Sequence, residues 1–106
     1  MSIALITLVG NIGQEPTLRD GSNDSKFATA TMAVNRGKGD ARTTQWFDLT
    51  VNGKLGEAFV QYTRKGDAVF VQGELTVKEK DGKTYLGVRV DNFRNMTPVE
   101  TAAEAG

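Results

Sequence analysis

Apolar residues recur at every second position along four separate stretches of this 106-residue chain. The stretches cover residues 26–35, 43–51, 68–77 and 83–91. Such alternation is typical of β-strands that bury one face and expose the other. The period changes once, after the second stretch, where apolar residues follow the helical spacing i, i+3, i+4, i+7. These positions are Leu55, Ala58, Phe59 and Tyr62. The pattern therefore predicts a β protein with one short helix.

The alternation also predicts which side chains form the core. The residues expected on the buried faces are Ala28, Ala30, Met32, Val34, Phe47, Leu49, Val51, Val69, Val71, Leu75, Val77, Thr84, Leu86, Val88 and Val90. We expect Gly73 to mark a bulge or bend within its strand. Asp81-Gly82 predicts a tight hairpin turn. The run Arg64-Lys65-Gly66 predicts the helix end, with two cations at the negative end of the dipole and a glycine cap.

The N-terminal segment has a different character. Residues 3–9 form an apolar, β-branched run that ends at Gly10-Asn11, which predicts a strand buried on both faces or paired with another subunit. Most of residues 13–25 is expected to be loop, because Gly, Pro, Asp, Asn and Ser occur throughout it. Residues after 98 offer little that could pack. We expect one domain over residues 1–98 and a short flexible tail over residues 99–106.

The element order is three strands, a helix and two strands. An all-β, five-stranded Greek-key barrel of the OB type, with one short helix between strands three and four, has this order. A five-stranded sandwich with a helical plug is the alternative.

Composition excludes several classes of function. The chain has no Cys and no His, so it lacks thiolate or imidazole metal ligands, disulfides, Cys nucleophiles and His bases. No enzyme, metal or cofactor is expected. Lys plus Arg and Asp plus Glu number 13 each, so polyanion binding would depend on local basic clusters. The apolar N-terminal run follows no basic residue and is too short to span a membrane, which predicts a cytoplasmic protein without membrane contact.

Trp46 is the most informative candidate site residue. Phe47, Leu49 and Val51 occupy the core face of its strand, so the period of two places Trp46 on the opposite face. An exposed aromatic flanked by polar residues suits a base-stacking platform. A subunit contact, or cover from the loop at residues 36–42, is the alternative reading.

Basic residues gather in the two hairpin connections. Arg36, Lys38 and Arg42 occupy the first, opposed only by Asp40. The second holds Lys78, Lys80 and Lys83, whose charges are nearly cancelled by Glu79 and Asp81. An aromatic strand face between basic arms is how single-stranded nucleic acid is held without sequence reading. Solvation of the hairpin tips is the other interpretation, and it is the better one for the second hairpin taken alone.

Phe27 and Tyr85 also lie off the core faces by period. Each could stack on a base or cap one end of the barrel. The helix residues Phe59 and Tyr62 are expected to pack in the core.

Four segments closely resemble the bacterial-type single-stranded DNA-binding protein family. They are Leu8-Val-Gly-Asn-Ile-Gly-Gln-Glu-Pro-Thr-Leu-Arg19, Gln45-Trp-Phe, Gly53-Lys-Leu-Gly-Glu57 and Tyr62-Thr-Arg-Lys-Gly-Asp-Ala-Val-Phe-Val-Gln-Gly-Glu-Leu75. The resemblance extends over roughly residues 2–95. It implies an OB-fold, homo-oligomers that are usually tetramers (a dimer is the alternative), and protection of single-stranded DNA in replication, recombination and repair, close to the nucleoid.

The resemblance also assigns roles to individual residues. Trp46 matches a base-stacking position, Lys54 belongs to the family's Gly-Lys-Leu motif, and Arg36 and Arg42 lie in its DNA-contacting loop. The segment from residue 3 to residue 8 matches the strand that pairs between subunits.

The chain departs from the family pattern at several points. Asn52 stands where many members have Phe, and the long hairpins lack aromatic residues, which implies a greater reliance on charge. The chain stops at Gly106 without the acidic tip that recruits other proteins in the family, so we expect either a short paralogue without tail-mediated recruitment or an excised domain. Two further readings stay open: an OB-fold adaptor that binds a partner protein, and an RNA-binding relative.

Overall fold

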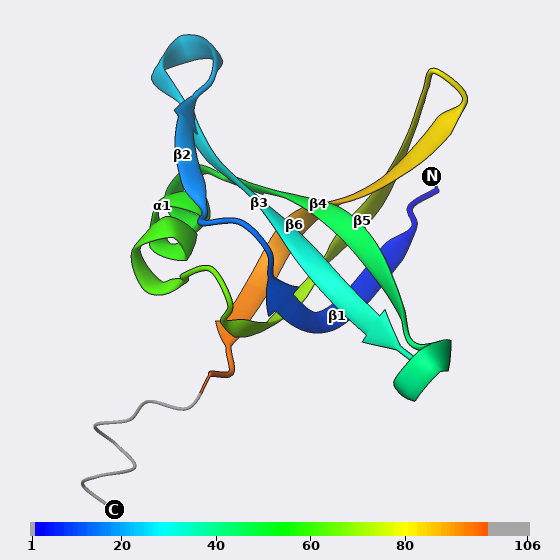
Figure 1. Ribbon diagram of the computed structural model, residues 1–106. Coiled ribbons are helices and arrows are strands. Elements are labelled where there is room, and N and C mark those ends of the chain that lie inside the picture. The colour runs from blue at the N-terminus through cyan, green and yellow to red at the C-terminus, as the bar shows by residue number, and fades with distance from the viewer. Residues whose placement is uncertain (1, 98–106) are drawn as a thin grey trace, which may run out of the picture.

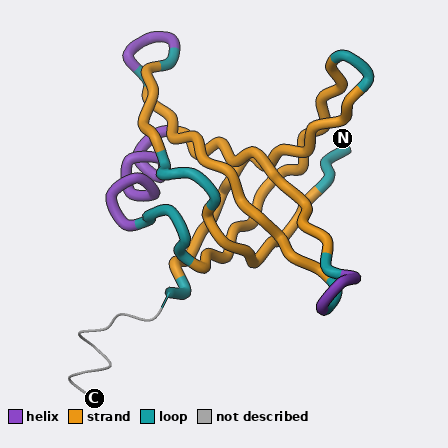
Figure 2. The backbone as a smooth tube through the Cα atoms, viewed as in Figure 1, coloured by secondary structure: helices purple, strands orange, loops and turns teal. Residues whose placement is uncertain are grey.

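The computed structural model describes residues 2–97, so the predicted tail at residues 99–106 and the boundary at residue 98 lie outside the described residues. Within residues 2–97 the fold has six strands and one α-helix (Figures 1 and 2). The strands are β1 (Leu5–Ile12), β2 (Thr17–Asp20), β3 (Lys26–Arg36), β4 (Thr43–Asn52), β5 (Ala68–Lys80) and β6 (Lys83–Asn95). The helix α1 spans Gly53–Tyr62, and two 3-10 turns, η1 and η2, span Ser22–Asp24 and Gly39–Ala41. A mostly β chain with one helix between β4 and β5 is consistent with an OB-fold.

All six strands belong to one sheet, in the order β1-β5-β6-β4-β3-β2. Neighbouring strands run antiparallel, except β4 and β6, which run parallel. The far end of β1 also pairs with β3, where Asn11 faces Ala33 and Ile12 faces Met32. The strand pairings therefore lead from β1 through β5, β6, β4 and β3 back to β1, with β2 attached outside this circuit.

Strand β2 corrects the prediction of five strands and of a loop over most of residues 13–25. It is four residues long and pairs with β3 from Thr17 opposite Thr29 to Asp20 opposite Lys26. Its neighbours are turn-forming residues, so the local sequence carries no strand pattern. β2 forms because β3 has a free edge with which residues 17–20 can pair, and because Leu18 packs against the core.

Strand β1 extends further than predicted and is buried on one face only. Leu8 and Ile12 lie in the core, whereas Ile3, Leu5 and Val9 are 60%, 68% and 54% exposed. The expectation of burial on both faces is therefore wrong within this chain. Because side chains alternate along a strand, the second apolar face of β1 remains uncovered.

β1 continues past its predicted end at Gly10-Asn11 because Gly10 has no side chain. A Cβ at this position would collide with the backbone carbonyl oxygen of Ala33 on β3. Glycine here allows β1 to cross close to β3 and to continue to Ile12, where the two strands pair. The residue predicted to end the strand instead permits the contact that joins its far end to β3.

The predicted core faces of β3, β4 and β6 are confirmed. The buried apolar residues are Leu8, Ile12, Ala28, Ala30, Met32, Phe47, Leu49, Val51, Phe59, Val69, Val71, Val88 and Val90. Phe59 of α1 is fully buried and meets Phe93 of β6 edge to face, with ring centroids 4.9 Å apart. The predicted irregularity at Gly73 is also present, because the β5–β6 register shifts between Gln72 and Gly73.

Three predicted core residues, Val77, Thr84 and Tyr62, are exposed instead. Val77 is 56% exposed because the β5–β6 hairpin projects beyond the body of the sheet, as the yellow segment of Figure 1 shows. Tyr62 is 64% exposed because α1 ends there and the chain turns inward at Thr63, which is buried. The buried residues of the helix are therefore Gly56 and Phe59, and Thr63 is buried directly after its end.

The end of α1 also differs from the predicted glycine cap. Thr63 is already extended, with φ −123° and ψ 138°. The Arg64 guanidinium donates through Nη1 to the carbonyl oxygens of Val60 (2.8 Å) and Thr63 (2.9 Å), so the predicted cation does satisfy the last carbonyl groups. Gly66 adopts φ +93° in the following turn, and its N–H donates to the carbonyl of Ile12 on β1.

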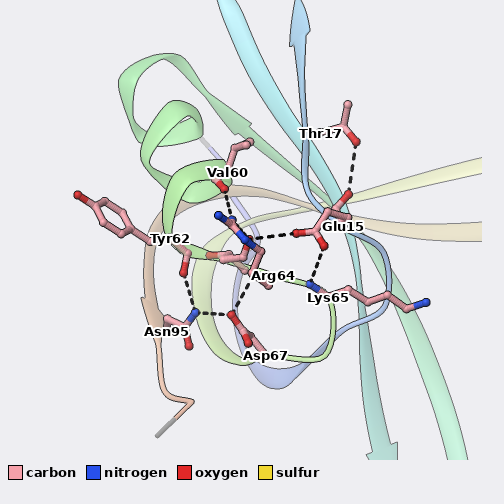
Figure 3. Close-up of polar contacts among 9 residues, drawn as sticks. Glu15, Thr17, Val60, Tyr62, Arg64, Lys65, Asp67 and Asn95 are labelled. Atoms are coloured by element: carbon pink, nitrogen blue, oxygen red, sulfur yellow. Dashed lines mark hydrogen bonds and ion pairs between the residues drawn. The ribbon is translucent and has the colours of Figure 1, made fainter. Parts of the chain in front are cut away.

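A polar network ties this turn to the rest of the sheet (Figure 3). The Asn95 side chain donates through Nδ2 to the Tyr62 carbonyl oxygen at 2.9 Å and to Asp67 Oδ2 at 2.8 Å. Asp67 Oδ2 also accepts from the backbone N–H of Arg64 at 2.9 Å. Glu15, before β2, lies 3.8 Å from Arg64 Nε. The network joins the last residues of α1 and β6, far apart in the sequence.

Candidate nucleic-acid interface

Strand β4 separates the core from an outward polar face. Phe47, Leu49 and Val51 are buried, and Trp46, between Gln45 and Phe47, is 56% exposed on the other side. This confirms that Trp46 lies off the core face. The alternation of side chains places Asp48 on the same outward face.

The outward face continues onto the neighbouring strands. On one side Trp46 pairs with Ala33 of β3, and on the other Asp48 pairs with Gly87 of β6. Gly87 in turn faces Thr76 of β5. The four strands β3, β4, β6 and β5 thus form one continuous surface with β4 and β6 at its centre.

Trp46 and Tyr85 line the same open hollow on this surface, although 38 residues lie between them in the sequence. The hollow has a volume of about 440 Å³, and Tyr85 is 45% exposed. Its lining residues are Gln45, Trp46, Asp48, Thr84, Tyr85 and Leu86. Two accessible aromatic rings in one groove suit the stacking of planar groups.

A second, smaller hollow adjoins the first. It has a volume of about 120 Å³ and shares Asp48, Tyr85 and Leu86 with the larger one. The other lining residues are Thr50, Thr76, Lys78 and Gly87. A Cβ at Gly87 would lie 2.6 Å from Thr76 Oγ1, so the missing side chain allows the Thr76 hydroxyl to lie close to the backbone of β6.

Gly13 lies directly against the indole ring of Trp46. A Cβ at Gly13 would collide with Cζ3 of the indole and lie 3.0 Å from its Cη2. The N–H of Gly13 donates to the Thr31 carbonyl on β3 at 2.8 Å, which places this backbone beside the tryptophan. The six-membered ring of Trp46 therefore rests against a residue without a side chain.

Of the predicted basic residues, Lys78 joins the groove. It lines the smaller hollow and pairs with Tyr85 across the β5–β6 hairpin. Lys80 and Lys83 pair with each other next to the turn at Asp81 and Gly82, beyond the groove. Both turn residues have positive φ (53° and 77°), which confirms the predicted tight hairpin.

Arg36, Lys38 and Arg42 lie in the β3–β4 connection around η2, and all three are exposed. Arg42 directly precedes β4, four positions before Trp46. In Figure 1 the β5–β6 hairpin projects toward the upper right and the β3–β4 connection toward the lower right. The two predicted basic arms therefore lie apart from each other.

Phe27 and Lys54 lie elsewhere. Phe27 pairs with Asn52 at the opposite end of β4 from the η2 connection, and it is half-buried. Lys54 lies in the first turn of α1, next to that same end, and is exposed. Neither residue lines the groove of Trp46 and Tyr85.

The groove contains residues that sequence reasoning did not assign to it. Asp48 and Gly87 come together in the groove through the pairing of β4 with β6, whereas Gly13 lies outside both hollows, against the ring of Trp46. The alternation of β4 could have indicated Asp48, because it places that residue beside Trp46. Nothing local indicates Gly13 or Gly87.

Across residues 2–97, no group of three or more Asp or Glu residues is arranged to hold a metal ion. In the same part of the chain, no helix is long and apolar enough to cross a membrane.

Comparison with known proteins gives a family and a related structure. The model of the single-strand binding protein family matches residues 3–95. The fold is similar to the crystal structure of a small single-stranded DNA-binding protein from Streptomyces coelicolor, with a TM-score of 0.76 and 28% sequence identity. That match covers 90% of this chain and 93% of the other. With nearly all of its described residues matched, this chain belongs to the single-strand binding protein family.

Proposed function

We propose that this protein binds and protects single-stranded DNA, without catalysis and without reading a defined sequence. The observation that carries the proposal is the groove in which Trp46 and Tyr85 stand open to solvent on the outward face of β4 and β6. Membership of the single-strand binding protein family supports it and favours it over a protein-binding adaptor. The same membership is the basis for proposing a role in replication, recombination and repair, with the protein located at the nucleoid in the cytoplasm.

Both base stacking and phosphate contacts contribute to the proposed binding energy. Stacking on an aromatic ring contributes about 1–3 kcal/mol per base and tolerates any base, because every base has a π-face. We assign this role to Trp46 and Tyr85, with Phe27 as a further platform at the other end of β4. Since Asn52 pairs with Phe27 there, that end offers fewer aromatic side chains.

Phosphate contacts come from the basic residues around the groove. We assign them to Lys78 beside Tyr85, to the exposed side chains of the η2 connection, and to three outlying lysines. These residues are Arg36, Lys38 and Arg42 in the connection, and Lys54, Lys80 and Lys83 outside it. Because the formal net charge of the chain is zero, these local clusters would supply the attraction to DNA.

The protein is proposed to act as a homo-oligomer, with a tetramer favoured over a dimer. The exposed apolar face of β1 at Leu5 and Val9, with Ile3 just before the strand, supports this, because a strand with one buried and one uncovered apolar face suits a subunit contact. The circuit of pairings from β1 back to β3 also supports the OB-type barrel.

The single tryptophan reports directly on the proposed site. Trp46 fluorescence is titrated with a long oligo-dT at low salt, and salt is then added to the complex. We expect strong quenching that salt reverses, because bases would stack on the indole while phosphate contacts release counterions. A flat titration together with no gel shift would overturn DNA binding and favour the adaptor.

Competition between DNA and RNA oligomers of equal length tests the nucleic acid itself. The outward face is proposed to bind DNA, and a ribose 2′-hydroxyl is what would let a protein distinguish the two. Tighter binding of the RNA oligomer would identify the chain as an RNA-binding relative.

A further inference from the structure

The two hollows of the outward face meet at an acidic residue. Asp48 lines both of them, together with Tyr85 and Leu86. Its side chain is exposed, and its neighbours along the same face of β4 are Trp46 and Thr50. Among the lining residues of the two hollows, Asp48 carries the negative charge and Lys78 the positive one.

A carboxylate in this place opposes the binding of phosphate. Like charges repel, so Asp48 weakens any path that brings the DNA backbone across the centre of the groove. The basic residues lie at its margins, in the η2 connection and on β5. This distribution of charge leaves the centre of the groove for bases and its edges for phosphates.

The groove also provides the space that a base edge would need. Asp48 and Thr76 both line the smaller hollow, and the strand pairings place them on either side of Gly87. A base stacked on Tyr85, which lines the same hollow, would therefore have its edge close to a carboxylate and a hydroxyl.

We propose that Asp48 accepts hydrogen bonds from the amino groups of stacked bases, so that the groove discriminates in favour of amino-bearing bases and against thymine. An ionised carboxylate accepts hydrogen bonds and donates none. Cytosine N4 and adenine N6 are amino donors, and Asp is a known acceptor for cytosine N4, whereas thymine presents the acceptor O4 at the corresponding position. The inference rests on the proposed function, because it concerns the same groove.

The test compares oligo-dC and oligo-dT of equal length, which differ at this exocyclic position and are both pyrimidines. Affinities are measured by the anisotropy of labelled oligomers in neutral to mildly alkaline buffer, for the wild type and for Asp48→Asn. The amide keeps the size of the side chain but also donates hydrogen bonds, so it can pair with thymine O4. We expect the ratio of dC affinity to dT affinity to fall roughly three- to tenfold in Asp48→Asn.

Asp40→Asn is the matched control. It removes one negative charge from the exposed η2 connection, outside both hollows. We expect it to strengthen binding of dC and dT by the same factor, because it changes only the attraction to phosphate.

The outcomes distinguish a failure of the inference about Asp48 from a failure of the proposed DNA binding. A fall in the ratio for Asp48→Asn alone supports the inference. An unchanged ratio, or equal gains for dC and dT in both variants, overturns it while leaving DNA binding intact. Failure of the folded wild type to bind either oligomer would overturn the proposed function, and the inference with it.

Discussion

At the scale of single residues, the contact between Trp46 and Gly13 shows how a stacking platform is positioned. An exposed tryptophan has rotamers to choose from, and a platform is effective only if its ring is already in place. Here the six-membered ring rests against Gly13, where any Cβ would collide with it. Gly13 is therefore a positioning residue for Trp46, acting from the segment between β1 and β2.

Gly13→Ala is expected to displace the indole and to weaken binding of oligo-dT by about three- to tenfold, less than Trp46→Ala, which should cost about 5- to 150-fold. The physical reason is the space that the added methyl group takes from Cζ3 and Cη2 of Trp46. Oligomer anisotropy measures both affinities, and the near-UV circular dichroism of the single tryptophan reports the displacement.

The double variant decides whether Gly13 acts through the tryptophan. If it does, Gly13→Ala has no further effect on affinity once Trp46 is Ala, because the two changes act on one interaction. Additive losses would contradict the positioning role and assign Gly13 to the stability of the fold.

At the scale of elements, Asn95 fastens the end of α1 to the end of β6. Its Nδ2 donates to the Tyr62 carbonyl and to Asp67 Oδ2 (Figure 3). Its Oδ1 accepts from the N–H of Thr97 at 2.9 Å. Helix α1 is only ten residues long, and helices of this length are marginal without tertiary contacts. The stability of α1 therefore depends on this connection and on the burial of Phe59.

Asn95→Ala is expected to lower the free energy of unfolding by about 2 kcal/mol, because three hydrogen bonds are lost and two of them are partly buried. Urea unfolding at a fixed protein concentration measures this change in the free energy of unfolding. Asn92→Ala is the matched control: it lies on the same strand, is exposed, and should change stability by less than about 0.5 kcal/mol. Equal losses in the two variants would refute the fastening role.

At the scale of the whole molecule, charge placement matters more than net charge. The chain carries 13 basic and 13 acidic residues, yet the η2 connection holds three exposed cations within seven positions, from 36 to 42. Binding that depends on such a cluster falls with salt in proportion to the number of phosphates neutralised.

Replacing Arg36, Lys38 and Arg42 together by Gln is expected to reduce the slope of log affinity against log salt by about 2, since each phosphate contact to a single strand contributes about 0.7. Titrations of labelled oligo-dT across a salt series measure the slope. Lys65→Gln, in the exposed turn after α1, serves as the control and should leave the slope nearly unchanged. A triple variant with the wild-type slope would remove the η2 connection from the DNA site.

Assembly is the second property of the whole molecule that can be tested. One subunit has a mass of 11.5 kDa, and we expect the wild type to sediment as a larger species. Leu5→Glu should shift the population toward smaller species, because it places a charge on the exposed apolar face of β1. Tyr62→Glu changes an equally exposed side chain on α1 and should leave the mass as it is. A wild type that sediments as a monomer would contradict the proposed oligomer.

Much of the fold could be predicted because the alternation of apolar residues is a local property. The buried faces at Ala28, Met32, Phe47 and Val88 follow from a period of two, and a side chain on a pleated strand has only two directions to take. The same rule predicted that Trp46 would lie off the core face. The stacking role of that residue, and the DNA-binding roles of the basic residues, stay predictions.

Tertiary structure decided everything that depends on pairing between distant segments. Strand β2 forms only because β3 offers it an edge, and β1 runs on past Gly10 because its backbone approaches Ala33. Tyr85 joins Trp46 in one hollow, and Gly87 comes to lie beside Asp48, through the parallel pairing of β4 with β6. The sequence by itself determined which face of each strand is buried, since that depends on neighbours along the chain. Which side chains share a groove depends on register between strands, and register is set only when the whole sheet has formed.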